Sequence, residues 1–320
     1  MITMLLAAQG SQANTLLRAA DEVRRTSVGD IIYTRAIIEF SNYCSKNCLY
    51  CGLRRDNKAI PRYRLTSEQI MNSAAQVASL GIKTIVLQSG EDRYYSSEQI
   101  AQIISKIKEK YDLTVTLSVG EHTFKDYRLW REAGADRFLL KHETADAKLF
   151  RYLRPDSTLN QRLQCIQWLN ELDYETGMGN MVGLPGQNLD TMARDALLMR
   201  RMKAKMAGVG PFLPHPSTPL KCASPGDLMA CLKMLAVTRL VLPYANLPVT
   251  TALRVLSPEE GLKLSLQSGA NVIMPNMTPL SVRENYVIYP QKADLKDSPQ
   301  EVFEDVKLQM QALDRSLDTA

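Results

Sequence analysis

The stretch Asn42-Tyr-Cys-Ser-Lys-Asn-Cys-Leu-Tyr-Cys-Gly-Leu-Arg-Arg55 carries three cysteines within eight residues, namely Cys44, Cys48 and Cys51. Iron–sulfur cubes ordinarily take four protein thiolates, so three in the spacing C-x3-C-x2-C leave one iron without a protein ligand. An open metal position is where substrate chemistry takes place, whereas a fully ligated metal is structural. The alternative is a zinc knuckle, which needs a fourth ligand at short range, and the next histidine is His122. The stretch therefore predicts a cluster with one open iron.

The cysteine spacing, with Tyr50 just before the last thiol, resembles that of the radical S-adenosylmethionine (SAM) superfamily. The resemblance implies that Cys44, Cys48 and Cys51 hold a [4Fe-4S] cluster, and that the amino and carboxylate groups of SAM fill the open position. An oxygen-sensitive cluster of this kind favours a reducing compartment. We therefore expect a cytoplasmic enzyme.

The composition argues against several other classes of protein. The 39 basic and 34 acidic residues give a net charge of +5, and they are scattered along the chain, so nucleic-acid binding is not expected. Six cysteines in 320 residues are too few for a disulfide scaffold. No apolar stretch reaches the roughly 18 residues of a membrane span, and the N-terminus lacks the basic region of a signal peptide. We therefore expect neither a membrane span nor a signal peptide.

Short β-rich runs alternate with longer helical patterns along almost the whole chain, which predicts an α/β fold with parallel strands. The expected strands are Ile32–Phe40, Thr84–Gln88, Thr114–Val119, Arg137–Leu140, Glu175–Val182, Ala207–Gly210, Val249–Thr251 and Asn271–Met274. Helices are expected to begin near Thr66, Ser96, Thr158, Pro225 and Ser257. Eight strands indicate a complete (β/α)8 TIM-type barrel, with an incomplete six-stranded barrel as the alternative. We expect one domain over 1–320, comprising an N-terminal helical extension (1–30), the barrel (31–290) and a C-terminal helical tail (291–320).

Unusual polar residues follow the predicted strands, at the end where barrels carry their chemistry. On the fourth strand Arg137, Lys141 and Glu143 share one face, because side chains alternate along a strand. Such charges are costly inside a barrel without partners, so they indicate either an ion-pair network or a cavity for polar or anionic groups. The turn Ser89-Gly-Glu-Asp92 allows backbone to approach a ligand closely. Arg162, on the following helix, is either a surface residue or a bidentate partner for a carboxylate.

The histidines give weaker signals than the cysteines. His142 has the outward parity of its strand and is expected to be structural. His122 and His215 occupy predicted loops, where they either line a cavity wall or have a satisfied structural role.

Several longer strings resemble the family of HydE-type maturases, radical SAM enzymes that help to build the active-site cluster of [FeFe]-hydrogenase. The strings are Arg35–Asn42, Cys48–Asn57, Thr84–Asp92, His142–Ala145, Leu153–Asp156, Tyr174–Gly177, Met181–Gln187, Gly210–Phe212, Pro214–Pro216 and Gly269–Asn276. The resemblance extends from about Ala19 to Tyr289 and implies a complete (β/α)8 barrel around a large internal cavity.

The resemblance also implies roles for individual residues. Those expected around SAM are Tyr50, Ser89, Gly90, Glu91, Ser118, Glu143 and Arg162, with Glu143 on the ribose hydroxyls and Arg162 on the carboxylate. Those expected at the deeper substrate end are Arg137, Lys141, Thr250, Thr251, Tyr286 and Tyr289. Two features depart from the family. Lys141 stands where the family suggests arginine, and lysine is not equivalent for planar anions. No cysteine follows Cys231, so a second, C-terminal iron–sulfur cluster is not expected.

The implied function is a step in the maturation of the hydrogenase active site, the H-cluster. An external electron donor such as ferredoxin or flavodoxin reduces the cluster, and SAM is cleaved to a 5′-deoxyadenosyl radical. The radical attacks the sulfur of a cysteine-bound Fe(CO)2(CN) precursor, a small organometallic substrate made by another hydrogenase maturase. One alternative is a radical SAM mutase or sulfur-inserting enzyme acting on a small amino or organic acid, similar to methylornithine synthase or biotin synthase. The other is an iron–sulfur carrier or electron-transfer protein.

Overall fold

The computed structural model describes residues 1–290 and 298–319, so 291–297 and residue 320 of the expected C-terminal tail lie outside the described residues. Its strands are β1 (Ile31–Thr34), β2 (Ala36–Ser41), β3 (Thr84–Ser89), β4 (Thr114–Ser118), β5 (Arg137–Leu139), β6 (Glu175–Val182), β7 (Met206–Pro211), β8 (Val272–Ile273) and β9 (Ser316–Leu317). They form a six-stranded sheet in the order β2-β3-β4-β5-β6-β7 and a three-stranded sheet in the order β8-β1-β9. Every neighbouring pair runs parallel, which confirms the predicted α/β class with parallel strands.

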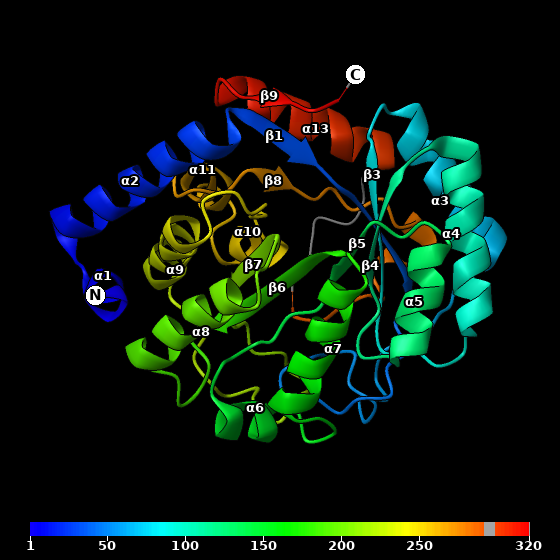
Figure 1. Cartoon of the computed structure of the whole chain (residues 1–320), viewed down its shortest axis with the longest axis horizontal. Coiled ribbons are helices and arrows are strands. Elements are labelled where there is room, and N and C mark those ends of the chain that lie inside the picture. The colour runs from blue at the N-terminus through cyan, green and yellow to red at the C-terminus, as the bar shows by residue number, and fades with distance from the viewer. Residues whose placement is uncertain (291–297, 320) are drawn as a thin grey trace.

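Helices surround these strands (Figure 1). They are α1 (Ile2–Ala7), α2 (Gly10–Val28), α3 (Ser67–Ser79), α4 (Ser97–Tyr111), α5 (Phe124–Glu132), α6 (Ala147–Leu153), α7 (Leu159–Glu171), α8 (Leu189–Arg201), α9 (Leu228–Val241), α10 (Thr251–Leu256), α11 (Gly261–Leu266), α12 (Leu280–Arg283) and α13 (Pro299–Ala312). The N-terminal extension contains two helices, and α2 packs against α9. Among the described residues, no helix has the length and apolar character needed to cross a membrane.

The first predicted strand is divided into two, because the chain exchanges partners on one side near Arg35. β1 pairs with β8 and β9, whereas β2 pairs with β3. The N–H of Arg35 donates to the carbonyl of Ile273 at 3.0 Å, so contact with the β8 side continues through the break. The C-terminal tail adds β9 to this edge, and Asp318 accepts a hydrogen bond from the N–H of Thr34 at 2.7 Å.

The predicted strand Val249–Thr251 is wrong, because Thr250 is the N-cap of α10. The preceding segment does lie between β7 and β8, but it meets each of them through a single bridged residue. Asn246 bridges to β7 and Pro248 bridges to β8. Proline has no N–H to donate to a ladder, which keeps the pairing short at this point.

Three of the predicted helix starts are confirmed by their capping geometry. The side chains of Thr66, Ser96 and Thr158 each accept a hydrogen bond from the N–H three residues later. The residue at that position is a glutamine in each case, and its side-chain oxygen accepts a hydrogen bond from the N–H of the cap residue. Such reciprocal caps satisfy two of the free N–H groups at a helix start. The starts predicted at Pro225 and Ser257 were too early, because α9 and α11 begin several residues further along.

The side chains of β5 point in two directions, some into the hydrophobic core beneath the helices and others toward an internal cavity. Phe138 is fully buried on the helix side, where its ring centroid lies 5.0 Å from that of Tyr127, 6.4 Å from Trp130 and 5.9 Å from Tyr174. Leu139 has the opposite parity and lines an internal cavity. The alternation predicted for this strand therefore places one set of side chains in the core and the other toward the site.

Replacing Phe138 with alanine is expected to lower the free energy of unfolding by about 3–5 kcal/mol, because it empties the centre of this aromatic cluster. Chemical denaturation followed by circular dichroism measures the loss. Tyr152→Ala is the matched control, since Tyr152 is 56% exposed and its truncation is expected to cost less than about 0.5 kcal/mol. Equal losses in the two variants would contradict the assignment of this cluster to the core.

Candidate active site

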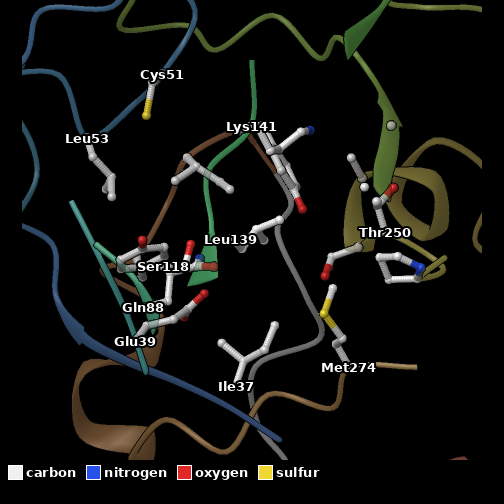
Figure 2. A pocket seen from close by; sticks show the side chains of 18 of the residues that line it. Ile37, Glu39, Cys51, Leu53, Gln88, Ser118, Leu139, Lys141, Thr250 and Met274 are labelled. Atoms are coloured by element: carbon white, nitrogen blue, oxygen red, sulfur yellow. The ribbon is translucent and has the colours of Figure 1, made fainter. Parts of the chain in front are cut away.

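A cavity of about 950 Å³ occupies the interior of the fold. The cysteine loop, the carboxyl ends of several strands, and residues of α10 and α13 line it. Figure 2 shows Cys51 and Leu53 on one side of this space, with Thr250 and Met274 on the other. The cavity therefore joins the cysteine loop to a deeper end that contains no cysteine among its described residues.

The structure brings together nearly all of the site residues expected from the sequence. Those that line the cavity are Cys44, Cys48, Tyr50, Cys51, Ser89, Gly90, Glu91, Ser118, Lys141, Glu143, Arg162, Thr250, Thr251, Tyr286 and Tyr289. They come from segments that span more than two hundred residues of sequence and meet only in the folded chain.

Arg137 is the exception, and its expected place in the substrate cavity is corrected by the structure. It starts β5, at the end of the strand opposite the cysteine loop, and it does not line the cavity. Its Nε lies 2.6 Å from Glu175 Oε2, and Nη1 donates to Thr84 Oγ1 at 3.3 Å. Arg137 and Lys141 are on the same face of the strand but about 13 Å apart along an extended chain. Residues on one face can therefore lie at opposite ends of the strand, and only Lys141 reaches the cavity.

The three cysteines lie on one loop after β2, and all are free thiols. Burial raises the pKa of Cys44 to about 11, and burial also raises the pKa values of Cys48 and Cys51. A buried thiolate needs positive charge or a metal nearby, so this set suits an iron–sulfur cluster. No three Cys, His, Asp or Glu side chains among the described residues are spaced for a single metal ion. A four-iron cube binds each thiolate at a separate corner, so its three sulfurs do not converge on one point.

The turn after β3 packs directly against the cysteine loop. A Cβ atom on Gly90 would lie 2.2 Å from the carbonyl oxygen of Tyr43, so only glycine allows this approach. The N–H of Glu91 donates to the Sγ atom of Cys44 at 3.4 Å, and its carbonyl accepts from the N–H of Ser45 at 2.9 Å. The two loops therefore form one unit, which places the carboxylate of Glu91 beside the thiols.

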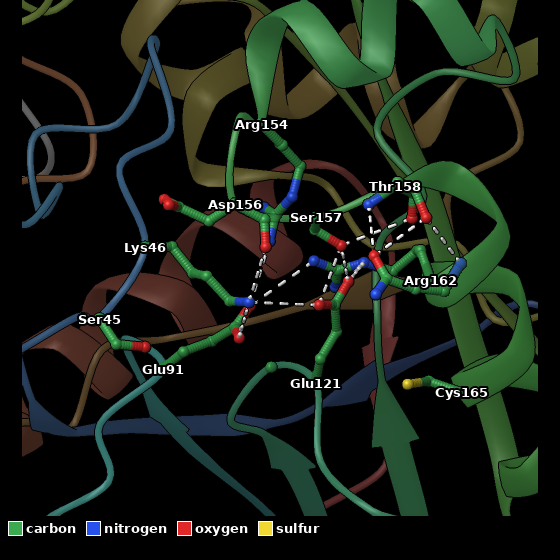
Figure 3. Close-up of polar contacts among 12 residues, drawn as sticks. Ser45, Lys46, Glu91, Glu121, Arg154, Asp156, Ser157, Thr158, Arg162 and Cys165 are labelled. Carbon is green, nitrogen blue, oxygen red and sulfur yellow. Dashed lines mark hydrogen bonds and ion pairs between the residues drawn. The ribbon is translucent and has the colours of Figure 1, made fainter.

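Five charged side chains form a network beside this unit (Figure 3). Oε1 of Glu91 accepts a hydrogen bond from Nη2 of Arg154 at 3.0 Å and lies 3.6 Å from Nη2 of Arg162. Oε1 of Glu121 lies 2.8 Å from Nε of Arg162, and Nζ of Lys46 lies within 3.6 Å of both carboxylates. Three cations therefore meet two carboxylates. One positive charge is in excess, which suits a bound anionic group.

Arg162 keeps hydrogen-bonding capacity for such a group. Among the described residues its Nε and Nη2 are buried, and their ion-pair contacts are not aligned as hydrogen bonds. Glu121 is ionised beside it: burial raises the pKa of this carboxyl, but Arg162 and the hydroxyl of Ser157 lower it to a net value below the ordinary one. The carboxylate of Glu121 is therefore charged at neutral pH.

Lys46, Glu121 and Arg154 were not among the site residues expected from the sequence. Glu121 follows β4 in a cluster of polar residues, and Arg154 belongs to the string Leu153–Asp156, so each had a signal in the sequence. Lys46 lies between two of the cysteines. None of these signals indicates a partner, because the partners come from other parts of the chain.

Glu143 has a backbone conformation that is unusual for its residue type. Its φ is 63°, in the left-handed region that glycine adopts most easily. Its N–H donates to the carbonyl of Gly179 at 3.0 Å, and its carbonyl accepts from the N–H of Met181 at 3.0 Å. These two bonds to β6 hold the turn, and the side chain of Glu143 lines the cavity. Strain of this kind is commonly found at functional sites.

The deeper end of the cavity combines hydroxyl groups with charged side chains, among them Lys141 and Arg254. Lys141 lines the wall and, within the described part of the chain, makes no side-chain hydrogen bond or ion pair. Thr250 donates to the carbonyl of Val209 at 3.2 Å. Burial raises the pKa of Tyr286 and Tyr289 above the ordinary tyrosine value, so both hydroxyls are protonated and can donate.

The histidines lie outside the cavity lining. His142 is fully buried with its Nε2 atom 3.6 Å from Asp195, which agrees with its expected structural position. His215 packs against the cysteine loop, where a Cβ atom on Gly52 would lie 2.6 Å from its Nε2. His122 contacts Trp130 edge-on, with ring centroids 4.7 Å apart.

His122 is expected to make stability depend on pH. Burial, and then the nearby Arg93, lower its pKa to about 4 from an ordinary value of 6.5. Between these values the unfolded chain binds a proton that the folded chain does not, so the free energy of unfolding falls as the pH drops from 6.5 toward 4. Urea unfolding at several pH values should show a shallower fall for His122→Gln than for the parent protein. Identical slopes would contradict the shifted pKa.

Comparisons with known proteins match the site and the fold. The Radical SAM superfamily matches residues 38–199. The chain is 53% identical over 277 residues to the [FeFe] hydrogenase maturase subunit HydE of Thermotoga maritima, which covers 87% of this chain and 79% of that protein. It is 28% identical over 284 residues to 3-methylornithine synthase of Methanosarcina barkeri, which covers 88% and 80%.

The structure is also similar to a solved structure of methylornithine synthase (PylB). The TM-score is 0.86 at 24% sequence identity, and the match covers 99% of this chain and 92% of that chain. At this identity the likeness establishes a shared fold, whereas function depends on the residues of the site.

Proposed function

The chain belongs to the HydE-type family of radical SAM [FeFe]-hydrogenase maturases, and we propose that it modifies a cysteine-bound Fe(CO)2(CN) precursor of the H-cluster. The observation that carries the proposal is the continuous cavity, which has three free thiols at one end and, at the other, a lysine that makes no side-chain hydrogen bond or ion pair with the described residues. The family relation and the bridges through Asn246 and Pro248 also support the complete (β/α)8 barrel, organised as one domain.

Cys44, Cys48 and Cys51 would hold the [4Fe-4S] cluster. Bound there, the cluster and SAM supply a reductively generated 5′-deoxyadenosyl radical for the attack on sulfur. The excess positive charge of the network favours the SAM carboxylate, with Arg162 as its bidentate partner. We propose that Glu143 accepts hydrogen bonds from the ribose hydroxyls. Tyr50, Ser89, Gly90, Glu91 and Ser118 would complete the wall around SAM.

The deeper residues would bind the iron complex. The ammonium of Lys141 suits a small anion, and a lysine acts as a point charge without the planar fork of arginine. Thr250, Thr251, Tyr286 and Tyr289 supply hydroxyl groups around the same space. We propose an external donor such as ferredoxin or flavodoxin as the electron source and another maturase as the source of the substrate. A reducing compartment such as the cytoplasm would protect the cluster. A second, C-terminal cluster is not part of the proposal.

The proposal is tested by incubating the anaerobically reconstituted protein with SAM, a reductant and a synthetic iron–dicarbonyl–cyanide–cysteine complex. SAM consumption that depends on the complex is expected, with 5′-deoxyadenosine or its sulfur adduct detected by mass spectrometry. Cys48→Ala should lose the cluster iron and all cleavage. SAM cleavage that responds only to a small amino or organic acid would overturn the assigned substrate in favour of a mutase or sulfur-inserting enzyme.

Lys141→Ala is expected to leave the SAM dissociation constant within about twofold of the parent value, because this residue belongs to the deeper end. Turnover of the iron complex should fall at least about tenfold, since hydrogen bonds to charged groups contribute about 1.5–3 kcal/mol. Isothermal titration calorimetry measures the SAM dissociation constant, and single-turnover kinetics measure the reaction of the iron complex. Lys148→Ala, on the exposed face of α6, is the control. A loss of SAM affinity without a loss of turnover would contradict the assignment of Lys141 to the substrate end of the cavity.

A further inference from the structure

The segment Leu153–Asp156, which comprises the last residue of α6 and the start of the loop before α7, holds the cysteine loop by contacts at both of its ends. The N–H of Leu49 donates to the carbonyl of Leu153 at 2.9 Å. At the other end, the carboxylate of Asp156 accepts a hydrogen bond from the N–H of Asn47 at 2.5 Å, and the backbone carbonyl of Asp156 accepts one from Nζ of Lys46 at 3.3 Å. These contacts fall between Cys44 and Cys51, which is the part of the loop that must present the thiols.

Arg154 connects this segment to a second loop. Its Nη1 donates to the hydroxyl of Tyr50 at 3.0 Å, and its Nη2 donates to Oε1 of Glu91 at 3.0 Å. The side chain is only 9% exposed and lies beside the cysteine loop (Figure 3). One planar guanidinium therefore contacts both the loop that carries the thiols and the turn that follows β3.

We propose that Arg154 is a positioning residue that fixes Tyr50 relative to Glu91, and so holds the walls of the SAM site at the distance that SAM requires. The inference rests on the proposed function, because that function assigns both walls to SAM. The sequence string around Arg154 belongs to the family resemblance, yet the proposed function gives Arg154 no role of its own beyond its share of the charge of the network. Its contacts supply one.

The shape of the side chain matters in this role as much as its charge. Arginine presents several N–H donors in a rigid plane, so it reaches two acceptors at once without losing much further entropy. A lysine at the same position keeps the charge but offers one nitrogen on a flexible stem. Glu91 also lies 3.6 Å from both Lys46 and Arg162. Without Arg154 its carboxylate is therefore free to turn toward these longer contacts.

The test measures SAM binding to the cluster-loaded protein, together with the electron paramagnetic resonance spectrum of the reduced cluster before and after SAM is added. Arg154→Gln and Arg154→Lys are both expected to weaken SAM binding about tenfold and to reduce the spectral change on SAM addition, with iron content unchanged. Tyr50→Phe in the Arg154→Gln background should add less than it does alone, because the two residues act through one contact. Arg151→Gln is the matched control, an exposed arginine of α6 whose hydrogen bond goes to the carbonyl of Ser157.

An Arg154→Lys variant with the affinity and spectrum of the parent protein would overturn the inference, because charge alone would then suffice. Unchanged behaviour of Arg154→Gln would overturn it as well. If Arg154→Gln loses iron, SAM binding and the spectral change are compared in Arg154→Lys and Tyr50→Phe instead, and both variants are expected to show the weaker binding. A parent protein that binds no SAM would instead overturn the proposed function, so the two failures are distinguishable.

Discussion

The cysteine loop has no regular secondary structure of its own, so the whole site depends on the backbone hydrogen bonds that fix it from outside. Ser45, Leu49 and Gly52 donate their N–H groups to carbonyls in the turn after β3, at the end of α6 and in the segment after α12. These three segments are far apart in sequence and meet only when the fold is complete. The directions of the thiols are therefore set by the tertiary structure, and the C-x3-C-x2-C spacing is necessary without being sufficient.

The charge balance beside this loop follows from the same constraint. Buried charges are costly unless they are paired, and removing one partner leaves the other uncompensated. Glu91 and Glu121 compensate most of the charge on Lys46, Arg154 and Arg162, and the remaining positive charge lies at the wall of the cavity. An arrangement of this kind is preorganised, because the cations are held in place by the protein before a ligand arrives.

The sequence predicts the chemistry of this protein better than it predicts the geometry. Cys44, Cys48 and Cys51 form a local motif, and the caps at Thr66, Ser96 and Thr158 are equally local, so each could be predicted from the sequence. Arg154 was missed because its partner Tyr50 lies 104 residues away, and no periodic pattern encodes such a contact. Arg137 was misplaced because alternation determines the face of a strand and not the depth along it.

The fold itself does not decide the substrate. Methylornithine synthase shares the fold at a TM-score of 0.86, so a parallel α/β framework of this shape is compatible with more than one substrate. The residues near the thiols serve SAM in the proposal and would be needed whatever the substrate is. The difference between substrates must then lie at the deeper end, around Lys141, Thr250 and Tyr289. The lining there carries positive charge on Lys141 and Arg254 and also includes the carboxylate of Glu39, so the placement of these charges, and not the fold, selects between an anionic substrate and a zwitterionic amino acid.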